Sequence, residues 1–270
     1  MRSTLAVIAT AVVVLPLGAQ DTLSRADRFT RNCDSFGRRD SERFCEVRDA
    51  RMPAGQRIYV DARENGSVRF FGSDRNDVLV RALIQTYADT RSEAEALAKQ
   101  VHISANDGRV YSDGPSNRRY QGWYVSYEVW VPRKANLEAD THNGGLSVDA
   151  VEGRMELRAV NGSISLRDVG GDVRAETTNG SVSATLAGST WTGNYLDLET
   201  TNGSVVLDVP RGYNAQLETG TVNGGMSIDF PITVQGSISR RIQTKLGNGG
   251  PRIRAMTTNG GVRIREVRRD

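Results

Sequence analysis

Three aspartates occupy equivalent places in a repeated sequence pattern and could act together in chemistry. Asp149, Asp208 and Asp229 each lie six residues after an asparagine that begins an Asn-Gly pair. If the repeats stack, these carboxylates could line up and, with Ca²⁺ and a basic side chain, support polysaccharide cleavage. The two intervening repeats carry Arg167 and Thr185 at this place, which interrupts the row. We therefore interpret the three aspartates as regular surface charges of the repeat and not as a catalytic or metal-binding set.

No other group of side chains has the spacing of a catalytic or metal site. His102 and His142 have no cysteine, serine or carboxylate set nearby that would suggest a triad or a zinc site. The chain lacks nucleophile-elbow, Walker and dinucleotide-binding motifs. Residues 144–149 resemble the Ca²⁺-binding nonapeptide but lack its central glycine. We expect no enzymatic activity, no cofactor and no metal.

Four aromatic residues lie close together in a β-prone stretch and could form a binding platform. They are Trp123, Tyr124, Tyr127 and Trp130. Because side chains alternate between the two faces of a strand, some of these rings must face outwards, where they could stack on a sugar or contact a partner. The alternative is that the helix or the N-terminal segment covers them, and the sequence leaves both open.

Asn-Gly pairs recur along the chain and define the repeat. A first pair begins at Asn65, and from Asn143 onwards the successive spacings are 18, 18, 23, 21, 25 and 11 residues. In a stacked fold each asparagine could hydrogen-bond its equivalents above and below, while glycine adopts the backbone conformation of the corner. The predicted row of turn asparagines is Asn143, Asn161, Asn179, Asn202, Asn223, Asn248 and Asn259.

Apolar and polar residues alternate on both sides of each Asn-Gly pair, which is the period of a β-strand. Leu137–Thr141 precedes a pair and Leu146–Val148 follows it, for example. Asn-Gly also favours hairpins, so an up-and-down meander is one reading. Hairpins do not require successive turns to share a sequence, whereas stacked coils do. We therefore predict an all-β fold, a parallel β-solenoid or β-helix-like repeat domain over residues 51–270.

The remaining segments fit around this array. Residues 58–70 flank Asn65-Gly66 and resemble a divergent first coil, and Val78–Tyr87 is a further predicted strand. Ser92–Val101 predicts one short helical excursion near 91–102, with Ser92 as N-cap and Glu95 as its capping-box partner. We expect this helix to cover one end or side of the solenoid. The arginine-rich stretch 262–270 is expected to be the strand of a terminal coil, protected by charge.

The N-terminal residues indicate export. Arg2 precedes an apolar run from Leu5 to Leu17 that is too short to span a bilayer, so residues 1–19 are interpreted as a signal peptide cleaved near Ala19. Residues 20–50 are interpreted as an N-terminal extension. It carries the only two cysteines, Cys33 and Cys45, which in an exported protein are expected to form a disulfide.

The iterated Asn-Gly-Ser-Ile/Val-Ser unit, together with the run Val129–Pro132 and Leu137–Thr141, resembles the bacterial DUF4097-type family of adhesin-like proteins. The resemblance covers about residues 55 to 268. It implies a β-solenoid fold, export in bacteria and an adhesive or envelope role, and it supplies no catalytic motif. The cysteine segment and the helix fall outside the repeat.

Charge composition bears on the partner. The formal net charge is +3, with 35 basic and 32 acidic residues interleaved, so there is no basic block of the kind that binds nucleic acid. We expect an exported, non-catalytic envelope protein that binds an envelope glycan or another envelope protein through its repetitive polar surface. Alternatives are a β-helix carbohydrate-active enzyme and a regulatory domain that binds another envelope protein. The sequence predicts no transmembrane segment in the mature chain.

Overall fold

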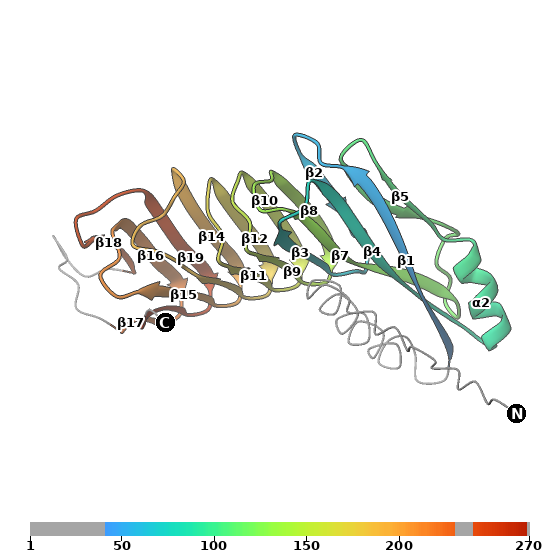
Figure 1. Cartoon of the computed structure of the whole chain (residues 1–270). Coiled ribbons are helices and arrows are strands. Elements are labelled where there is room, and N and C mark those ends of the chain that lie inside the picture. Colours follow the sequence, from blue (N-terminus) through green and yellow to red (C-terminus); the bar gives the residue numbers. More distant parts are fainter. Residues whose placement is uncertain (1–40, 230–239, 269–270) are drawn as a thin grey trace, which may run out of the picture. The chain divides into compact units, whose positions relative to one another are not determined.

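Two ten-stranded β-sheets, called sheets A and B, enclose one hydrophobic core (Figure 1). The computed structural model describes residues 41–229 and 240–268, which belong to the compact unit Gly37–Asp270. Sheet A contains, in spatial order, β1(Glu42–Pro53), β4(Asp77–Ala88), β7(Gly122–Pro132), β3(Val68–Ser73), β9(Leu146–Asp149), β11(Ile164–Arg167), β13(Val182–Thr185), β15(Val205–Pro210), β20(Val262–Val267) and β17(Met226–Ile228). Sheet B contains β18(Arg241–Leu246), β16(Ala215–Asn223), β19(Arg252–Asn259), β14(Tyr195–Asn202), β12(Val173–Asn179), β10(Met155–Asn161), β8(Leu137–Asn143), β2(Ile58–Asp61), β6(Arg109–Asp113) and β5(His102–Asn106).

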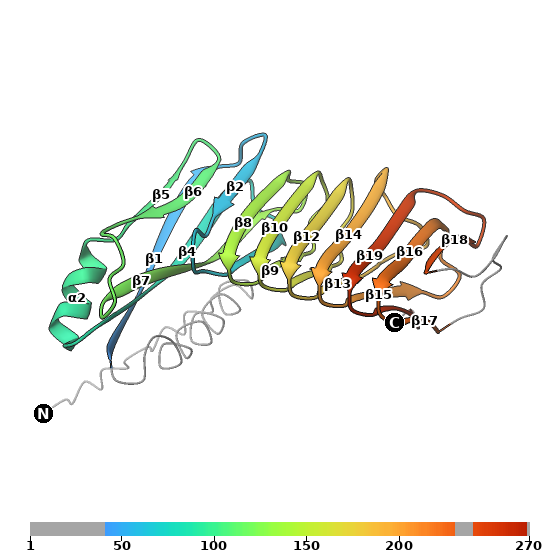
Figure 2. The same cartoon turned by 180° about the vertical axis from the view of Figure 1, so that it is seen from behind.

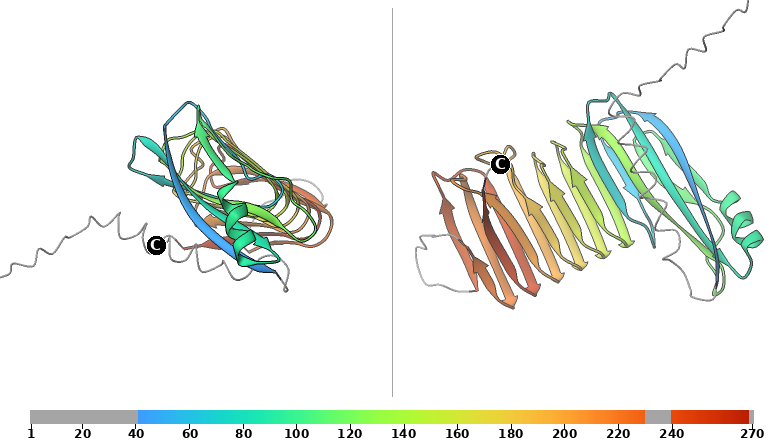
Figure 3. Two further views of the ribbon diagram at one scale, coloured as in Figure 1. Left: turned by 90° about the vertical axis from the view of Figure 1, so that its right-hand side faces the viewer. Right: turned by 60° about the horizontal axis from the view of Figure 1, so that its bottom comes forward.

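Each repeat is one coil, made of a strand in sheet B, an Asn-Gly corner and a strand in sheet A. The coils lie one behind another in the view along the stack (Figure 3, left). Strands β8, β10, β12 and β14 pair in parallel, and Asn161 is in register with both Asn143 and Asn179. The predicted parallel β-solenoid is therefore confirmed, and the hairpin meander is wrong for the repeat region.

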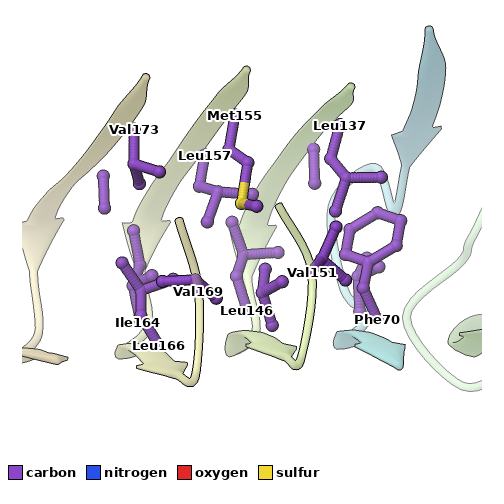
Figure 4. Packing of buried hydrophobic residues seen from close by; sticks show 14 of the residues in the cluster. Phe70, Leu137, Leu146, Val151, Met155, Leu157, Ile164, Leu166, Val169 and Val173 are labelled. Atoms are coloured by element: carbon purple, nitrogen blue, oxygen red, sulfur yellow. The ribbon is translucent and has the colours of Figure 1, made fainter. Parts of the chain in front are cut away.

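Strict alternation of apolar and polar residues places one face of each coil strand in the core. In β10, Met155, Leu157 and Ala159 are buried while Glu156 and Arg158 point outwards. Figure 4 shows side chains of β8, β10 and β12 packed against those of β3, β9 and β11. Burying each large aliphatic side chain in this way contributes about 1.5–3 kcal/mol.

The connections between coils also stack and close the third side of the core. Glu152 forms parallel bridges with both Lys134 and Gly170 in the neighbouring connections. Val151 and Val169, from two of these connections, point into the core between the sheets (Figure 4).

The last coil in the sequence is not the last coil in space. Strands β19 and β20 lie between the coil β14–β15 and the coil β16–β17 (Figures 1 and 2). The expectation that the stretch 262–270 forms a terminal coil is therefore wrong for β20. Residues Val262–Ile264 of β20 pair with β15 on one side and with β17 on the other, so Arg263 does not protect an exposed edge. Antiparallel β18 lies at that edge of sheet B instead.

The opposite end of the stack is built from antiparallel strands and the helix. Strands β1 and β7 flank β4, and β5 and β6 form a hairpin at the edge of sheet B. The only helix among the described residues, α2(Arg91–Lys99), buries Ala94, Leu97 and Ala98 against this end. Its N-cap is Thr90, with Glu93 completing the capping box, so the predicted pair Ser92 and Glu95 is corrected by two residues.

Strand β1 corrects the predicted boundary of the N-terminal extension. All twelve of its residues, from Glu42 to Pro53, pair with β4. The folded sheet therefore begins within the segment 20–50.

The predicted signal peptide (residues 1–19) and Cys33 lie outside the described residues. Cys45 lies in β1, in register with Gln85, and its pairing with Cys33 stays a prediction. Within residues 41–229 and 240–268, no helix is both long and apolar enough to cross a membrane.

Candidate binding surface

The corner asparagines form a continuous row of side-chain hydrogen bonds. Each Nδ2 donates to the Oδ1 of the next asparagine in the row at 2.8–3.0 Å. The donation runs in one direction through Asn223, Asn259, Asn202, Asn179, Asn161, Asn143 and Asn65. This row, called the corner row, follows spatial and not sequence order.

Asn248 does not belong to the corner row, which corrects the predicted set. It lies in the loop between β18 and β19, where its backbone N–H donates to Asn214 Oδ1. Its place is taken in space by Asn259, because β18 folds back antiparallel on β16 and does not start a new coil. The Asn-Gly pair at 248 thus marks an ordinary turn.

Glycine follows each corner asparagine because neighbouring coils approach very closely there. A Cβ atom on Gly162 would overlap the carbonyl oxygen of Gly144 in the preceding coil, and the same holds for Gly180 against Gly162. This close approach applies to every corner, and Gly180, Gly203 and Gly260 also have the predicted positive φ, between +149° and +158°. Every larger residue would push two coils apart.

Threonine hydroxyl groups donate hydrogen bonds to the glycine carbonyl oxygens of the corners. Thr177 Oγ1 donates to Gly162 O at 2.8 Å, and four other coils repeat this bond at 2.7–2.9 Å. These threonines are nearly buried beside the corner row. The coil with Ala159 lacks the hydroxyl. The threonine row was not predicted, although the repeated Thr-x-Asn-Gly spacing in the sequence could have indicated it.

The outer face of sheet B carries ion pairs both along a strand and between neighbouring strands. Glu156 accepts hydrogen bonds from Arg154 at 2.7 Å and from Arg158 at 2.8 Å, and these bonds hold its pKa below the ordinary value. Arg254 on β19 contacts Asp197 at 2.8 Å and Glu199 at 2.6 Å on β14. The charges on this face are therefore largely compensated within the surface itself.

An open groove of about 650 Å³ crosses five coils on this face, next to the corner row. It is lined by charged residues (Asp61, Arg63, Asp140, Arg158, Arg174, Glu176 and Glu199), by His142, Ala159 and Val160, and by Thr141, Thr177, Thr178 and Thr201. In register, Asp61, Asp140, Arg158, Glu176 and Glu199 follow one another across neighbouring strands. The groove thus offers hydrogen-bond donors and acceptors at intervals of one strand spacing, about 4.8 Å.

The three aspartates considered for catalysis do not form one cluster. Asp149 pairs with Arg167 at 2.5 Å, and strands β11 and β13 separate it from Asp208 on β15. Asp208 pairs with Arg265 at 2.6 Å. Asp229 follows β17 on the other side of β20, where its backbone N–H donates to Ile264 O. Each of the two paired carboxylates thus has an arginine from a neighbouring coil, as structural charges do.

Strand alternation divides the four aromatic residues of the predicted platform. Tyr127 is fully buried in the core, and Trp123 is partly buried against the same core. Trp130 is on the opposite face but only 6% exposed, because Phe71 stacks on it at 5.5 Å and the Arg81 guanidinium lies over its ring. Tyr124 is half-buried. The four rings therefore do not form one exposed platform.

The histidines do not contribute to a metal site. His142 lines the groove, and exposed His102 lies on the edge strand β5. Among the described residues, no three His, Cys, Asp or Glu side chains come together in a way that could hold a metal ion.

Comparison with known proteins places these features in a family. The family model described as Toastrack DUF4097 matches residues 77–265. No curated protein matches the chain. Among solved structures, a candidate cell adhesion protein from Clostridium sporogenes is 9% identical with a TM-score of 0.44, covering 82% of this chain and 100% of its own.

Two further solved structures are similar. A candidate adhesin from Bacteroides fragilis is 14% identical with a TM-score of 0.35, and the match covers 82% of this chain and 97% of that one. A candidate lipid-binding protein from Parabacteroides distasonis is 11% identical with a TM-score of 0.34, covering 83% and 96%.

Proposed function

Since the chain belongs to the Toastrack DUF4097 family, we propose that it is a non-catalytic binding protein of the bacterial envelope that holds an extended polar polymer in the groove on sheet B. The observation that carries this proposal is the groove itself. It crosses five coils and repeats polar side chains at every strand.

The chemistry of the groove favours a ligand that is polar and nearly neutral. Its lining contains four carboxylates and three arginines, so neither a strongly anionic nor a strongly cationic polymer finds a uniform field. Carboxylates and guanidinium groups next to threonine hydroxyls can accept from and donate to sugar hydroxyl groups. Val160, 37% exposed on the groove floor, offers an apolar contact for a sugar ring. We therefore propose a glycan chain as the ligand.

Many weak and repeated contacts suit such a ligand. Backbone hydrogen bonds between the strands and the corner row fix the shape of the groove. The protein therefore loses little conformational entropy when a ligand binds. Successive sugar units that bind successive coils add avidity without a deep pocket. Export after cleavage near Ala19 would bring the protein to envelope glycans, whether in the periplasm, at the cell surface or outside the cell.

A glycan-array and envelope-fraction binding screen with the mature chain tests the proposal. We expect Thr178→Trp to abolish glycan binding, because the bulky ring fills the groove at an exposed position of β12. Ser165→Trp is the matched control, since Ser165 is equally exposed in the neighbouring coil but lies on sheet A. It should leave binding unchanged.

Three results would count against the proposal. Binding that both variants retain would remove the groove as the site. Capture of an envelope protein without any glycan would favour the regulatory alternative. Release of shortened glycan products would show that the chain is an enzyme.

A further inference from the structure

The Asn-Gly corners are chemically alike but structurally unequal at one end of the stack. Six of the seven corner glycines donate their backbone N–H to the carbonyl oxygen of the asparagine in the next coil, at 2.9–3.1 Å. They are Gly66, Gly144, Gly162, Gly180, Gly203 and Gly260. Gly224 belongs to the outermost coil, and no described residue accepts its N–H.

The side chain of Asn223 is also held on one side only. Its Nδ2 donates to Asn259 Oδ1 at 2.9 Å, but no described residue donates to its own Oδ1. The five asparagines between the two ends of the corner row both donate and accept. At Asn223–Gly224, then, both the amide nitrogen and the carboxamide have more freedom than elsewhere in the row.

These two groups can react with each other, and we propose that Asn223 is the site of spontaneous deamidation in this protein. The Gly224 nitrogen attacks Cγ of Asn223 after it loses its proton to hydroxide or to a buffer base. The new N–Cγ bond closes a cyclic imide, and the Cγ–Nδ2 bond breaks with protonation of the departing nitrogen to ammonia. Water then opens the imide to aspartate or isoaspartate.

The corner architecture protects the other asparagines from the same step. In the internal corners the attacking glycine nitrogen is engaged in an inter-coil hydrogen bond, and the carboxamide is fixed by bonds to both neighbours. The reaction needs the nitrogen to approach Cγ, and this requires the coil to open locally. Asn248 is protected in another way, because Gly249 N–H donates to Leu246 O within its turn.

The modification would change the end of the stack. A carboxylate at position 223 has no N–H to donate to Asn259 Oδ1, so the corner row loses its first hydrogen bond. An isoaspartate also lengthens the backbone at a corner where neighbouring coils are in tight contact. We expect the outermost coil, β16–β17, to open more readily after the reaction.

Peptide mass spectrometry of the folded mature chain, aged at mildly alkaline pH, tests this site. We expect Asn223 to be converted about tenfold faster than Asn161 or Asn179, the factor that one backbone hydrogen bond is worth. In urea the rates at these positions should converge, because unfolding removes the protection. Equal rates in the folded protein, or faster conversion at Asn248, would overturn the proposal.

A second measurement separates the chemistry from the stability of the coil. Asn223→Asp should increase hydrogen exchange of β16 amides and leave exchange in β10 unchanged. Unaltered exchange in β16 would show that the end of the row does not hold the outermost coil in place.

Discussion

At the scale of single residues, the corner is defined by three side-chain requirements that differ in strictness. Asparagine supplies a donor and an acceptor to the corner row, threonine saturates a glycine carbonyl, and glycine leaves room for the neighbouring coil. Only the glycine is required for steric reasons. Water can replace a lost hydrogen bond at an exposed corner, but an overlap between atoms can be relieved only by moving the coils apart.

Replacing a corner glycine should therefore be costly. We expect Gly162→Ala to destabilise the protein by about 3 kcal/mol, since the new Cβ overlaps Gly144 O. Gly225→Ala is the matched control, because a Cβ there has no heavy atom within 4 Å. Urea unfolding of both variants measures the difference, and equal midpoints would refute the close-approach explanation.

Adding the missing threonine should stabilise its coil. Ala159 is in register with Thr141 and Thr177, and a hydroxyl at this position could donate to Gly144 O. We expect Ala159→Thr to raise the free energy of unfolding by about 1 kcal/mol. Thr177→Val, which removes the bond to Gly162 O with little change in volume, should lower it by a similar amount. Thermal unfolding of the two variants tests the sign of each effect.

At the scale of elements, charge complementarity around β19 and β20 favours the observed position of the inserted coil. The inserted strand β19 places Arg254 between Asp197 on β14 and Glu218 on β16, its in-register neighbours. On the other sheet, Arg265 of β20 pairs with Asp208 of β15. Without the insertion, Asp197 and Glu218 would face each other directly, and like charges in opposite positions are destabilising.

The ion pairs on sheet B should also make stability depend on pH. The folded-state pKa of Glu156 is lowered from 4.5 by hydrogen bonds from Arg154 and Arg158. A lowered pKa stabilises the fold above the unfolded-state value, and this contribution is lost as pH falls through the folded-state pKa. Glu156→Gln should thus lower stability by about 1 kcal/mol or less at neutral pH and have little effect in acid.

Denaturant unfolding at neutral and acidic pH measures this difference. Glu64→Gln is the control, because Glu64 is exposed and forms no ion pair with any described residue. If Glu156→Gln still lowers the free energy of unfolding at acidic pH, the Glu156 side chain acts through packing and not through its charge.

At the scale of the whole molecule, the described coils form one continuous core although their order in space departs from the sequence. The chain completes the coil β16–β17 before it returns to fill the gap beside β14–β15. This gap must therefore stay open, or open again, until the C-terminal coil is inserted. Contacts across the gap join residues as far apart as Asp197 and Arg254.

Cysteine cross-linking can test the insertion. Val206 is in register with Arg263, and Arg263 with Ser227, all on the outer face of sheet A. We expect Val206→Cys with Arg263→Cys to form a disulfide, because adjacent strands lie about 4.8 Å apart. Val206→Cys with Ser227→Cys should not, since β20 separates them. Mass mapping distinguishes these bonds from any that involve Cys45, and a 206–227 bond would refute the order.

The repeating unit of the fold and its corners follow from local sequence patterns. Alternation with a period of two specifies which side chains enter the core, and a repeated Asn-Gly pair favours stacking of equivalent corners, as Asn143, Asn161 and Asn179 show. Both are local properties that each coil carries in its own residues. They allowed the parallel fold to be predicted, together with a repetitive polar outer surface.

The order in which the coils stack depends on contacts that appear only in the folded chain. Every corner has the same shape, so the coil of Asn259 and the coil of Asn223 could each stack on that of Asn202, and spacing along the chain cannot choose between them. The choice rests on contacts between distant residues, such as Arg254 with Asp197, and on β18, which folds back on β16. For the same reason the tertiary structure alone excluded Asn248 from the corner row.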